Sequence, residues 1–182
     1  MIESAKPNQA GIAVKWAIIN VITAIVVTYI FQLLGTDVSA PVRYLAYIPF
    51  IAFVCLAQIE YRDKASGFMT YGQGFVEGLL FGVFSGIMLA IFMYLYYAVL
   101  YPQGVDQMVA AAHDKMVAQG QSSDAIDTAT EMTKKYGAIF ASVGGLFGTP
   151  IAAIIVSLIT AAIFKKEPTI ADIESRQNDT TV

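Results

Sequence analysis

The chain has 182 residues, of which 57% are hydrophobic and 14% are charged, and its formal net charge is −3. Charged residues make up about a quarter of an ordinary soluble domain, so this composition predicts an integral membrane protein. The length allows one compact bundle and no second domain of ordinary size. A nucleic-acid partner is not expected, because nucleic acids are bound through clustered basic residues and the sequence has no such cluster.

Four apolar stretches without charged residues predict four membrane-spanning helices, because a bilayer core of about 30 Å requires roughly 20 helical residues. The second stretch is short, and we expect Arg43 and Glu60 to lengthen it by extending their polar ends away from apolar stems. The sequence therefore predicts an all-α, four-helix transmembrane bundle that forms one domain over residues 1–182. The expected spans are residues 14–34, 43–60, 75–101 and 137–164.

The third predicted span carries four glycines at strict four-residue spacing, which predicts a glycine zipper on one face of the helix. Helices in lipid associate chiefly through close packing over small residues, so this face indicates a contact with another helix. The fourth span repeats small residues at the same spacing, and the simplest arrangement sets the two faces together. The residues expected to form the contact are Gly74, Gly78, Gly82 and Gly86 in the third span, and Ala141, Gly145, Gly148 and Thr149 in the fourth.

Two prolines and a glycine-rich loop complete the expected membrane portion. Pro49 and Pro150 are expected to kink the second and fourth spans, because proline removes a helical hydrogen bond. The loop over residues 62–74 interleaves aromatic residues with glycines, and we expect it to lie along the inner headgroups before the third helix begins. A phosphate-binding loop is disfavoured there, because Phe75 and Val76 follow the glycines where such a loop needs Lys and Ser or Thr.

Residues 102–136 predict an extracytoplasmic helical hairpin between the third and fourth spans. Gly120 can end its first helix, and Ser122 or Ser123 can cap its second. Pro102 separates the hairpin from the third span, and Gly137 provides a bend into the fourth. An apolar stripe on the first helix packs on its neighbour or on the membrane surface, or serves as a docking face for a partner protein. The stripe consists of Val105, Met108, Val109, Ala112, Met116 and Val117.

The distribution of Lys and Arg predicts that both termini are cytoplasmic, because basic residues gather in cytoplasmic loops. Tyrosines gather toward the outer ends of the spans, as interfacial aromatic belts do. Residues 165–182 are then a cytoplasmic tail. With both termini inside, the basic residues on the cytoplasmic side are Lys6, Lys15, Arg62, Lys64, Lys165, Lys166 and Arg176, and those on the other side are Arg43, Lys115, Lys134 and Lys135.

Three segments carry a resemblance to a known family. They are Gly67-Phe68-Met69-Thr70-Tyr71-Gly72-Gln73-Gly74-Phe75, Glu131-Met132-Thr133-Lys134-Lys135-Tyr136 and Ile163-Phe164-Lys165-Lys166-Glu167. In these segments and in the order of its spans, the chain resembles the bacterial family catalogued as domain of unknown function 4199. The resemblance implies a multi-pass, four-helix protein of the bacterial inner membrane, and it brings no established activity or catalytic residues.

The sequence offers little material for catalysis, so we expect no enzyme activity, metal or cofactor. The single histidine, His113, has neither a second histidine nor a nearby thiol to complete a metal or haem site. The serines of the spans, Ser85, Ser142 and Ser157, lie at small-residue packing positions without a companion base. The lone cysteine, Cys55, lies in an apolar run and is expected to be a small core residue.

A candidate polar site consists of Glu77 in the third span and Asn20 in the first, because polar groups within the membrane are costly and mark function. An interfacial Glu77 that extends its carboxylate to the headgroups is the favoured interpretation of that residue. The leading hypothesis is a non-catalytic accessory or scaffold subunit that holds another membrane protein or a second copy of itself, with membrane lipids around it. The alternative is a small oligomeric transporter or lipid-binding protein, with Glu77, Asn20 and the proline kinks around a cavity.

Overall fold

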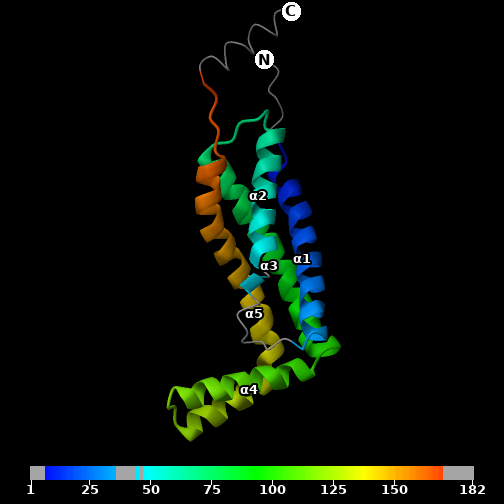
Figure 1. Ribbon diagram of the computed structural model, residues 1–182, viewed down its shortest axis with the longest axis vertical. Helices are drawn as coiled ribbons and strands as arrows, with labels where there is room; N and C mark the ends of the chain where they lie inside the picture. Colours follow the sequence, from blue (N-terminus) through cyan, green and yellow to red (C-terminus); the bar gives the residue numbers. More distant parts are fainter. Residues whose placement is uncertain (1–6, 36–43, 46, 170–182) are drawn as a thin grey trace, which may run out of the picture.

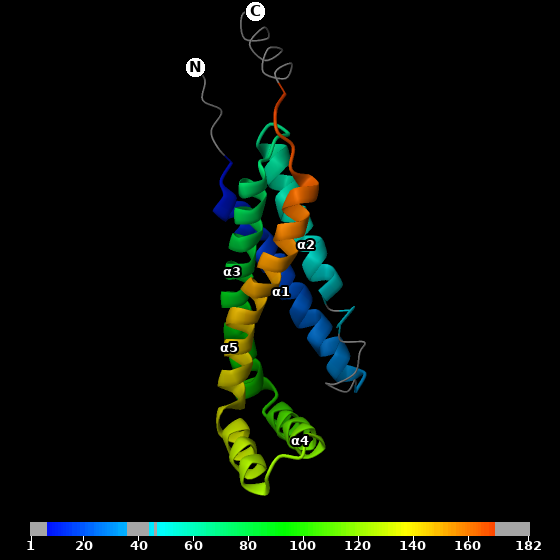
Figure 2. The ribbon, with the colours of Figure 1, turned by 90° about the vertical axis from the view of Figure 1, so that its left-hand side faces the viewer.

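The computed structural model describes residues 7–35, 44–45 and 47–169. Four long helices run alongside one another and a fifth lies across one end, which we call the α4 end (Figures 1 and 2). The opposite end, where α1 begins and α5 finishes, is called the terminal end. The elements are α1 (Gln9–Leu33), α2 (Tyr47–Lys64), α3 (Tyr71–Leu95), the π-helical turn η2 (Tyr96–Leu100), α4 (Gln103–Ala118) and α5 (Ser123–Phe164).

The helices begin and end at residues with recognisable capping chemistry. The side chains of Asn8, Thr70 and Ser122 each accept a hydrogen bond from a backbone amide in the first turn of α1, α3 and α5. Gln73 completes a capping box with Thr70, which satisfies two amides reciprocally. Gly120, with φ +68°, follows the end of α4 in the left-handed conformation that favours glycine. α1 and α3 thus start earlier than the predicted residues 14 and 75.

Three helical segments are long and apolar enough to cross a membrane: Gln9–Leu33, Tyr71–Leu100 and Ser123–Phe164. α2 is not among them. It has 18 residues, and its last turns carry Glu60, Arg62, Asp63 and Lys64. The expected span 43–60 therefore stays a prediction, and its residues 43 and 46 lie outside the described part of the chain.

The predicted separation of the hairpin from the fourth span is wrong, because α5 is one helix from Ser123 to Phe164. Its first part lies beside α4 and the remainder rises along α3 (Figure 1). Gly137 lies inside this helix, and its missing side chain makes room for α4: a Cβ there would be 2.9 Å from Cγ1 of Val105. Pro49 lies in the first turn of α2, where proline costs no helical hydrogen bond, so the kink expected there is also wrong.

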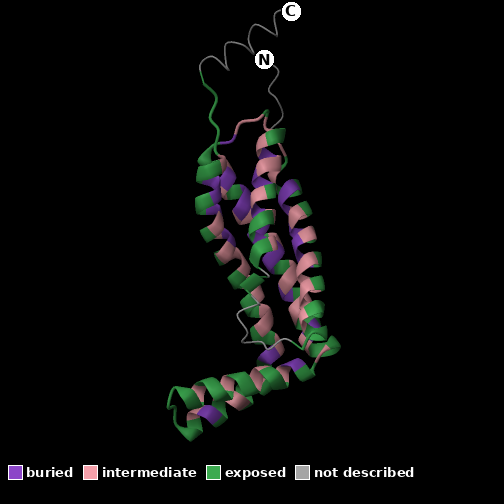
Figure 3. Ribbon diagram, viewed as in Figure 1, coloured by how far each residue is buried: buried purple, intermediate pink, exposed green. Residues whose placement is uncertain are grey.

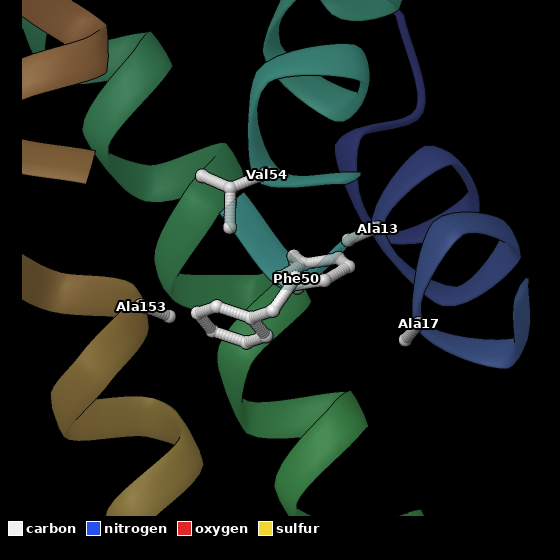
Figure 4. Close-up of a cluster of buried hydrophobic side chains, with 6 residues drawn as sticks. Ala13, Ala17, Phe50, Val54 and Ala153 are labelled. Atoms are coloured by element: carbon white, nitrogen blue, oxygen red, sulfur yellow. The ribbon is translucent and has the colours of Figure 1, made fainter. Parts of the chain in front are cut away.

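The core lies between the helices in the half of the bundle nearer the terminal end. Phe81 of α3 packs into a buried cluster formed by side chains of α1, α2 and α5 (Figure 4). Its neighbours from α1 and α5 are alanines, so these helices approach α3 closely. Figure 3 shows buried residues on the inward faces of the helices and mostly exposed residues on α4. The cluster consists of Ala13, Ala17, Phe50, Val54, Phe81 and Ala153.

The loop between α2 and α3 is tied to the chain that follows α5. Met69 and Lys166 exchange two backbone hydrogen bonds, of 2.9 and 2.8 Å, in an isolated antiparallel bridge. Met69 is buried and packs with Ile12 and Tyr61. The expectation that residues 62–74 lie along the headgroups is therefore wrong for the second half of the loop, where Met69 is in the core and α3 begins at Tyr71.

Candidate functional site

The four glycines at four-residue spacing lie on the face of α3 that meets α5, and both helices run antiparallel there. A Cβ at Gly78 would lie 2.8 Å from the Cβ of Ser157, and one at Gly74 would lie 3.1 Å from the Cβ of Ala161. A Cβ at Gly82 would overlap the Cβ of Ala153. At Gly86, the added atom would be 2.9 Å from Cδ of Pro150 and 3.0 Å from the carbonyl oxygen of Leu146. Real Cβ atoms essentially never show the distances found at Gly78, Gly82 and Gly86, so only glycine fits at these three positions, whereas the contact at Gly74 is tight.

The small residues expected on the fourth span divide into two groups. Gly145 faces α3, where a Cβ would make an ordinary contact of 3.6 Å with the amide nitrogen of Ala90. Gly148 does not belong to the helix contact as predicted, because an added Cβ would meet nothing within 4 Å. Thr149 contributes its carbonyl oxygen near Gly82, and Ala141 is half-buried.

Glu77 is completely buried, so the interfacial position favoured from the sequence is wrong. Neither carboxylate oxygen has a hydrogen-bond partner among the described residues. A carboxylate in such a place is costly unless a cation or a proton compensates it.

Other buried polar atoms lie where α3 meets α2 and α5, and they have no hydrogen-bond partner among the described residues. Gln58 donates a hydrogen bond of 3.0 Å to the carbonyl oxygen of Gly74, but its own carbonyl oxygen accepts none. The hydroxyl of Ser157 lies against Gly78 and has no partner among the described residues. A Cβ added at Gly78 would lie 3.3 Å from the side-chain amide nitrogen of Gln58. The α3 hydroxyl of Ser85 is also without a partner. These groups make the interior of the bundle more polar than its apolar spans suggest.

Glu60 joins α1 to α2 at the terminal end. Its carboxylate accepts from Lys15 and, at 2.7 Å, from the indole nitrogen of Trp16. Lys64, one turn further along α2, lies 3.0 Å from its other oxygen. The sequence assigned Glu60 only the role of a span boundary, whereas the structure makes it the centre of a charged network between two helices.

A cavity of about 1140 Å³ lies at the α4 end, between α1, the start of α2, the end of α3 with η2, α4 and α5. Figure 2 shows α1 and α5 diverging toward this end. Asn20 and Pro49 line the cavity, as does the open face of α5 at Gly144 and Gly148. Glu77 does not line it, so the structure does not bring the two members of the candidate polar site together. The volume of the cavity is slightly above the usual range for small-molecule pockets, about 300–1,000 Å³.

Asn20 is the buried polar group of this cavity. It is near the middle of α1 and is 6% exposed. A hydrogen bond made away from bulk water is worth more than one made in it, so the side-chain amide favours a polar group that enters the cavity.

Tyrosines form two walls of the cavity. Tyr44 and Tyr47 are stacked, with ring centroids 6.3 Å apart, beside the start of α2. On the side of η2, the ring of Tyr96 is 5.0 Å from that of Tyr97 and 5.7 Å from that of Tyr101. Tyr96 and Tyr97 lie in the π-helical turn and Tyr101 follows it, and π-turns are frequent at functional sites. The sequence attributed the tyrosines to an interfacial belt, because residues so far apart along the chain give no sign that they share a cavity.

Polar contacts fix part of this wall. Tyr96 donates a 2.7 Å hydrogen bond to Gln32 of α1, and Gln107 of α4 donates one of 2.8 Å to the hydroxyl of Tyr101. Among the described residues that line the cavity, the one charged residue is Asp114 of α4, and none is Lys or Arg.

His113, the residue examined as a metal ligand, lies on α4 with Nδ1 3.3 Å from its neighbour Asp114. Within residues 7–35, 44–45 and 47–169, no group of three or more His, Cys, Asp or Glu side chains is placed to hold a metal ion. The described residues that line the cavity include aromatic rings, side-chain amides and one carboxylate.

Comparison with known proteins gives a family but no activity. No curated protein and no solved structure matches the chain. The sequence model of one family, described as protein of unknown function (DUF4199), matches residues 15–166, which include every described helix at least in part. The chain therefore belongs to the DUF4199 family.

Proposed function

We propose that the protein is a non-catalytic integral membrane accessory or scaffold subunit that holds a partner membrane protein. The observation that carries the proposal is the contact of α3 with α5, in which glycine backbones of one helix meet side chains of the other. Such a contact leaves little freedom for the two helices to move against each other. The glycine face is occupied within the chain, so partners bind elsewhere.

The partner-binding element in this proposal is the segment formed by α4 and the first part of α5. α5 has 42 residues, about twice what a bilayer core requires, so part of it extends beyond the membrane. Because α5 is continuous, the contact with α3 also fixes the direction of the part beside α4. Most residues of the predicted apolar stripe on α4 are half-buried, and Val117 is exposed. Exposed Met132 adds a second apolar side chain on α5.

The proposed arrangement in the membrane follows the basic residues. α2 joins the three apolar helices as a fourth membrane helix, with Glu60 and Lys64 at the inner surface. The terminal end is cytoplasmic, and α4 is outside the bacterial inner membrane. Support for α2 comes from its packing against α1, α3 and α5.

Site-specific photo-crosslinking tests the scaffold function. A photoreactive residue at Val117 or Met132 should crosslink to a particular membrane protein in cells, whereas one at Ile159 of the membrane part should mainly capture lipid. All three side chains are exposed, which makes them matched positions. Gly82→Ala, which disturbs the α3–α5 contact, should reduce the crosslinks at Val117. Crosslinks to lipid alone at all three positions would contradict a scaffold role.

A second function, a small oligomeric transporter or lipid-binding protein, is favoured by the cavity at the α4 end. Scaffolds need no cavity of this size, and its lining includes the buried amide of Asn20. Native mass spectrometry of the intact protein tests this function. A small molecule or lipid that remains bound to the protein but not to Gly148→Leu, whose new side chain fills the cavity, would support it.

A further inference from the structure

The lining of the cavity restricts what it can bind. Aromatic rings attract cations through the negative potential of their faces, and groups of such rings are the usual site for quaternary ammonium ligands. Five lining residues are tyrosines, in the two walls described above. Asp114 adds a carboxylate, and no Lys or Arg is among the described residues of the lining, so these residues offer a phosphate or sulfate no counter-charge.

The apolar part of the lining indicates an amphiphilic ligand. Val27 of α1 and Leu89 and Met93 of α3 line the cavity together with small residues of α5. Gly148 faces open space, so the wall of α5 accommodates an alkyl chain without moving. A volume of about 1140 Å³ exceeds what a trimethylammonium group needs and leaves space for a tail.

We propose that the cavity binds an amphiphilic organic cation, with its quaternary ammonium group among the tyrosines and Asp114 and its tail along α1, α3 and α5. This inference rests on the second function above, the binding of a small molecule or lipid, and it identifies the chemical class of that ligand. The same group occurs in free alkylammonium compounds and in choline headgroups of lipids. Asp114 is exposed and attracts the cation at the mouth, while the rings recognise it by contact.

The test uses three ligands with the same eight-carbon tail and different charge: octyltrimethylammonium, octanol and octyl sulfate. The full chain is placed in nanodiscs of phosphatidylethanolamine and phosphatidylglycerol, which contain no choline, and binding to empty nanodiscs is subtracted. The ammonium compound should bind about tenfold more tightly than octanol, because several rings and a carboxylate act together. Octyl sulfate should bind more weakly than octanol.

Matched variants separate recognition from structural damage. Tyr47→Phe keeps the ring and should bind the ammonium compound within about twofold of the parent, whereas Tyr47→Leu should lose about threefold or more. Asp114→Asn should lose about two- to fivefold and make binding less sensitive to salt. Gly148→Leu should abolish binding, and Ala162→Leu, on an exposed part of α5 away from the cavity, should leave it unchanged.

Several results would overturn the proposal. Equal binding of octanol and the ammonium compound, or equal losses for Tyr47→Phe and Tyr47→Leu, would show that rings and charge do not select the ligand, while binding itself would stand. Failure of all three ligands to bind above the empty nanodiscs would remove the underlying binding function as well. Adding phosphatidylcholine to the nanodiscs distinguishes a free alkylammonium compound from the choline headgroup of a lipid as the natural ligand. Competition with the ammonium compound would indicate a lipid headgroup, and unchanged binding would indicate a free cation; either supports the proposal.

Discussion

Replacing Gly82 by alanine should destabilise the bundle through a single added methyl group. The new Cβ would overlap the Cβ of Ala153 and lie 3.2 Å from the Cα of Pro150. Non-bonded carbon atoms prefer about 3.5–4.0 Å, so α3 and α5 must separate or bend. Overpacking of this kind costs roughly 1–3 kcal/mol, and the backbone of Pro150 limits the relief available.

Gly148→Ala is the matched control, because it makes the same chemical change in the interior of α5. An added Cβ at Gly148 meets nothing within 4 Å. Alanine favours a helix over glycine by about 1 kcal/mol at both positions, so this contribution cancels when the two variants are compared. Gly148→Ala should therefore be more stable than Gly82→Ala by about 1–3 kcal/mol.

Reversible unfolding in mixed micelles, followed by the loss of helical circular dichroism, gives the free energy of unfolding for each variant. Adding Ala153→Gly to Gly82→Ala removes the overlapping methyl group and should restore most of the lost stability. A Gly82→Ala protein as stable as Gly148→Ala would refute the close α3–α5 contact, as would a double variant less stable than the single one.

Three further changes test other contacts by the same unfolding assay. Glu77→Gln keeps the shape of the buried side chain and removes a charge that has no partner among the described residues, so stability should be unchanged or higher; a loss of more than about 1 kcal/mol would indicate a bound cation. Glu60→Gln breaks the charged network with Lys15 and Trp16 and should cost about 1 kcal/mol, less at high salt, whereas no cost at low salt would exclude the network. Ser122→Ala removes the cap of α5 and should cost about 1 kcal/mol; equal stability would mean that the cap is not formed.

Local signals in the sequence located most of the helix ends. Gly120 was identified as the end of one helix and Ser122 or Ser123 as the cap of the next, and Ser122 is the cap, because such signals act over a few residues. Phe164 was also correctly predicted as the last residue of its helix. The starts of α1 and α3 were set too late, because the predicted spans followed the apolar stretches and disregarded Asn8 and Thr70.

Features that depend on neighbouring helices could not be derived in this way. Gly137 was expected to bend the chain, but a glycine that receives a side chain from another helix stays within its own helix. The burial of Glu77 depends on how α2 packs over α3, and no local pattern distinguishes it from an interfacial carboxylate. The cavity likewise arises where helices diverge, so only the structure unites Asn20 with the tyrosines.

Cysteine labelling in intact cells tests the proposed membrane arrangement most directly. Ser66, in the loop between α2 and α3, and Ser123, at the start of α5, are both exposed and are replaced singly by cysteine in a Cys55→Ala background. A membrane-impermeant maleimide should label the Ser123→Cys protein from outside and should label the Ser66→Cys protein only after the membrane is opened. Labelling of both positions from outside, or of Ser66→Cys alone, would contradict a scaffold that crosses the membrane and presents α4 outside it.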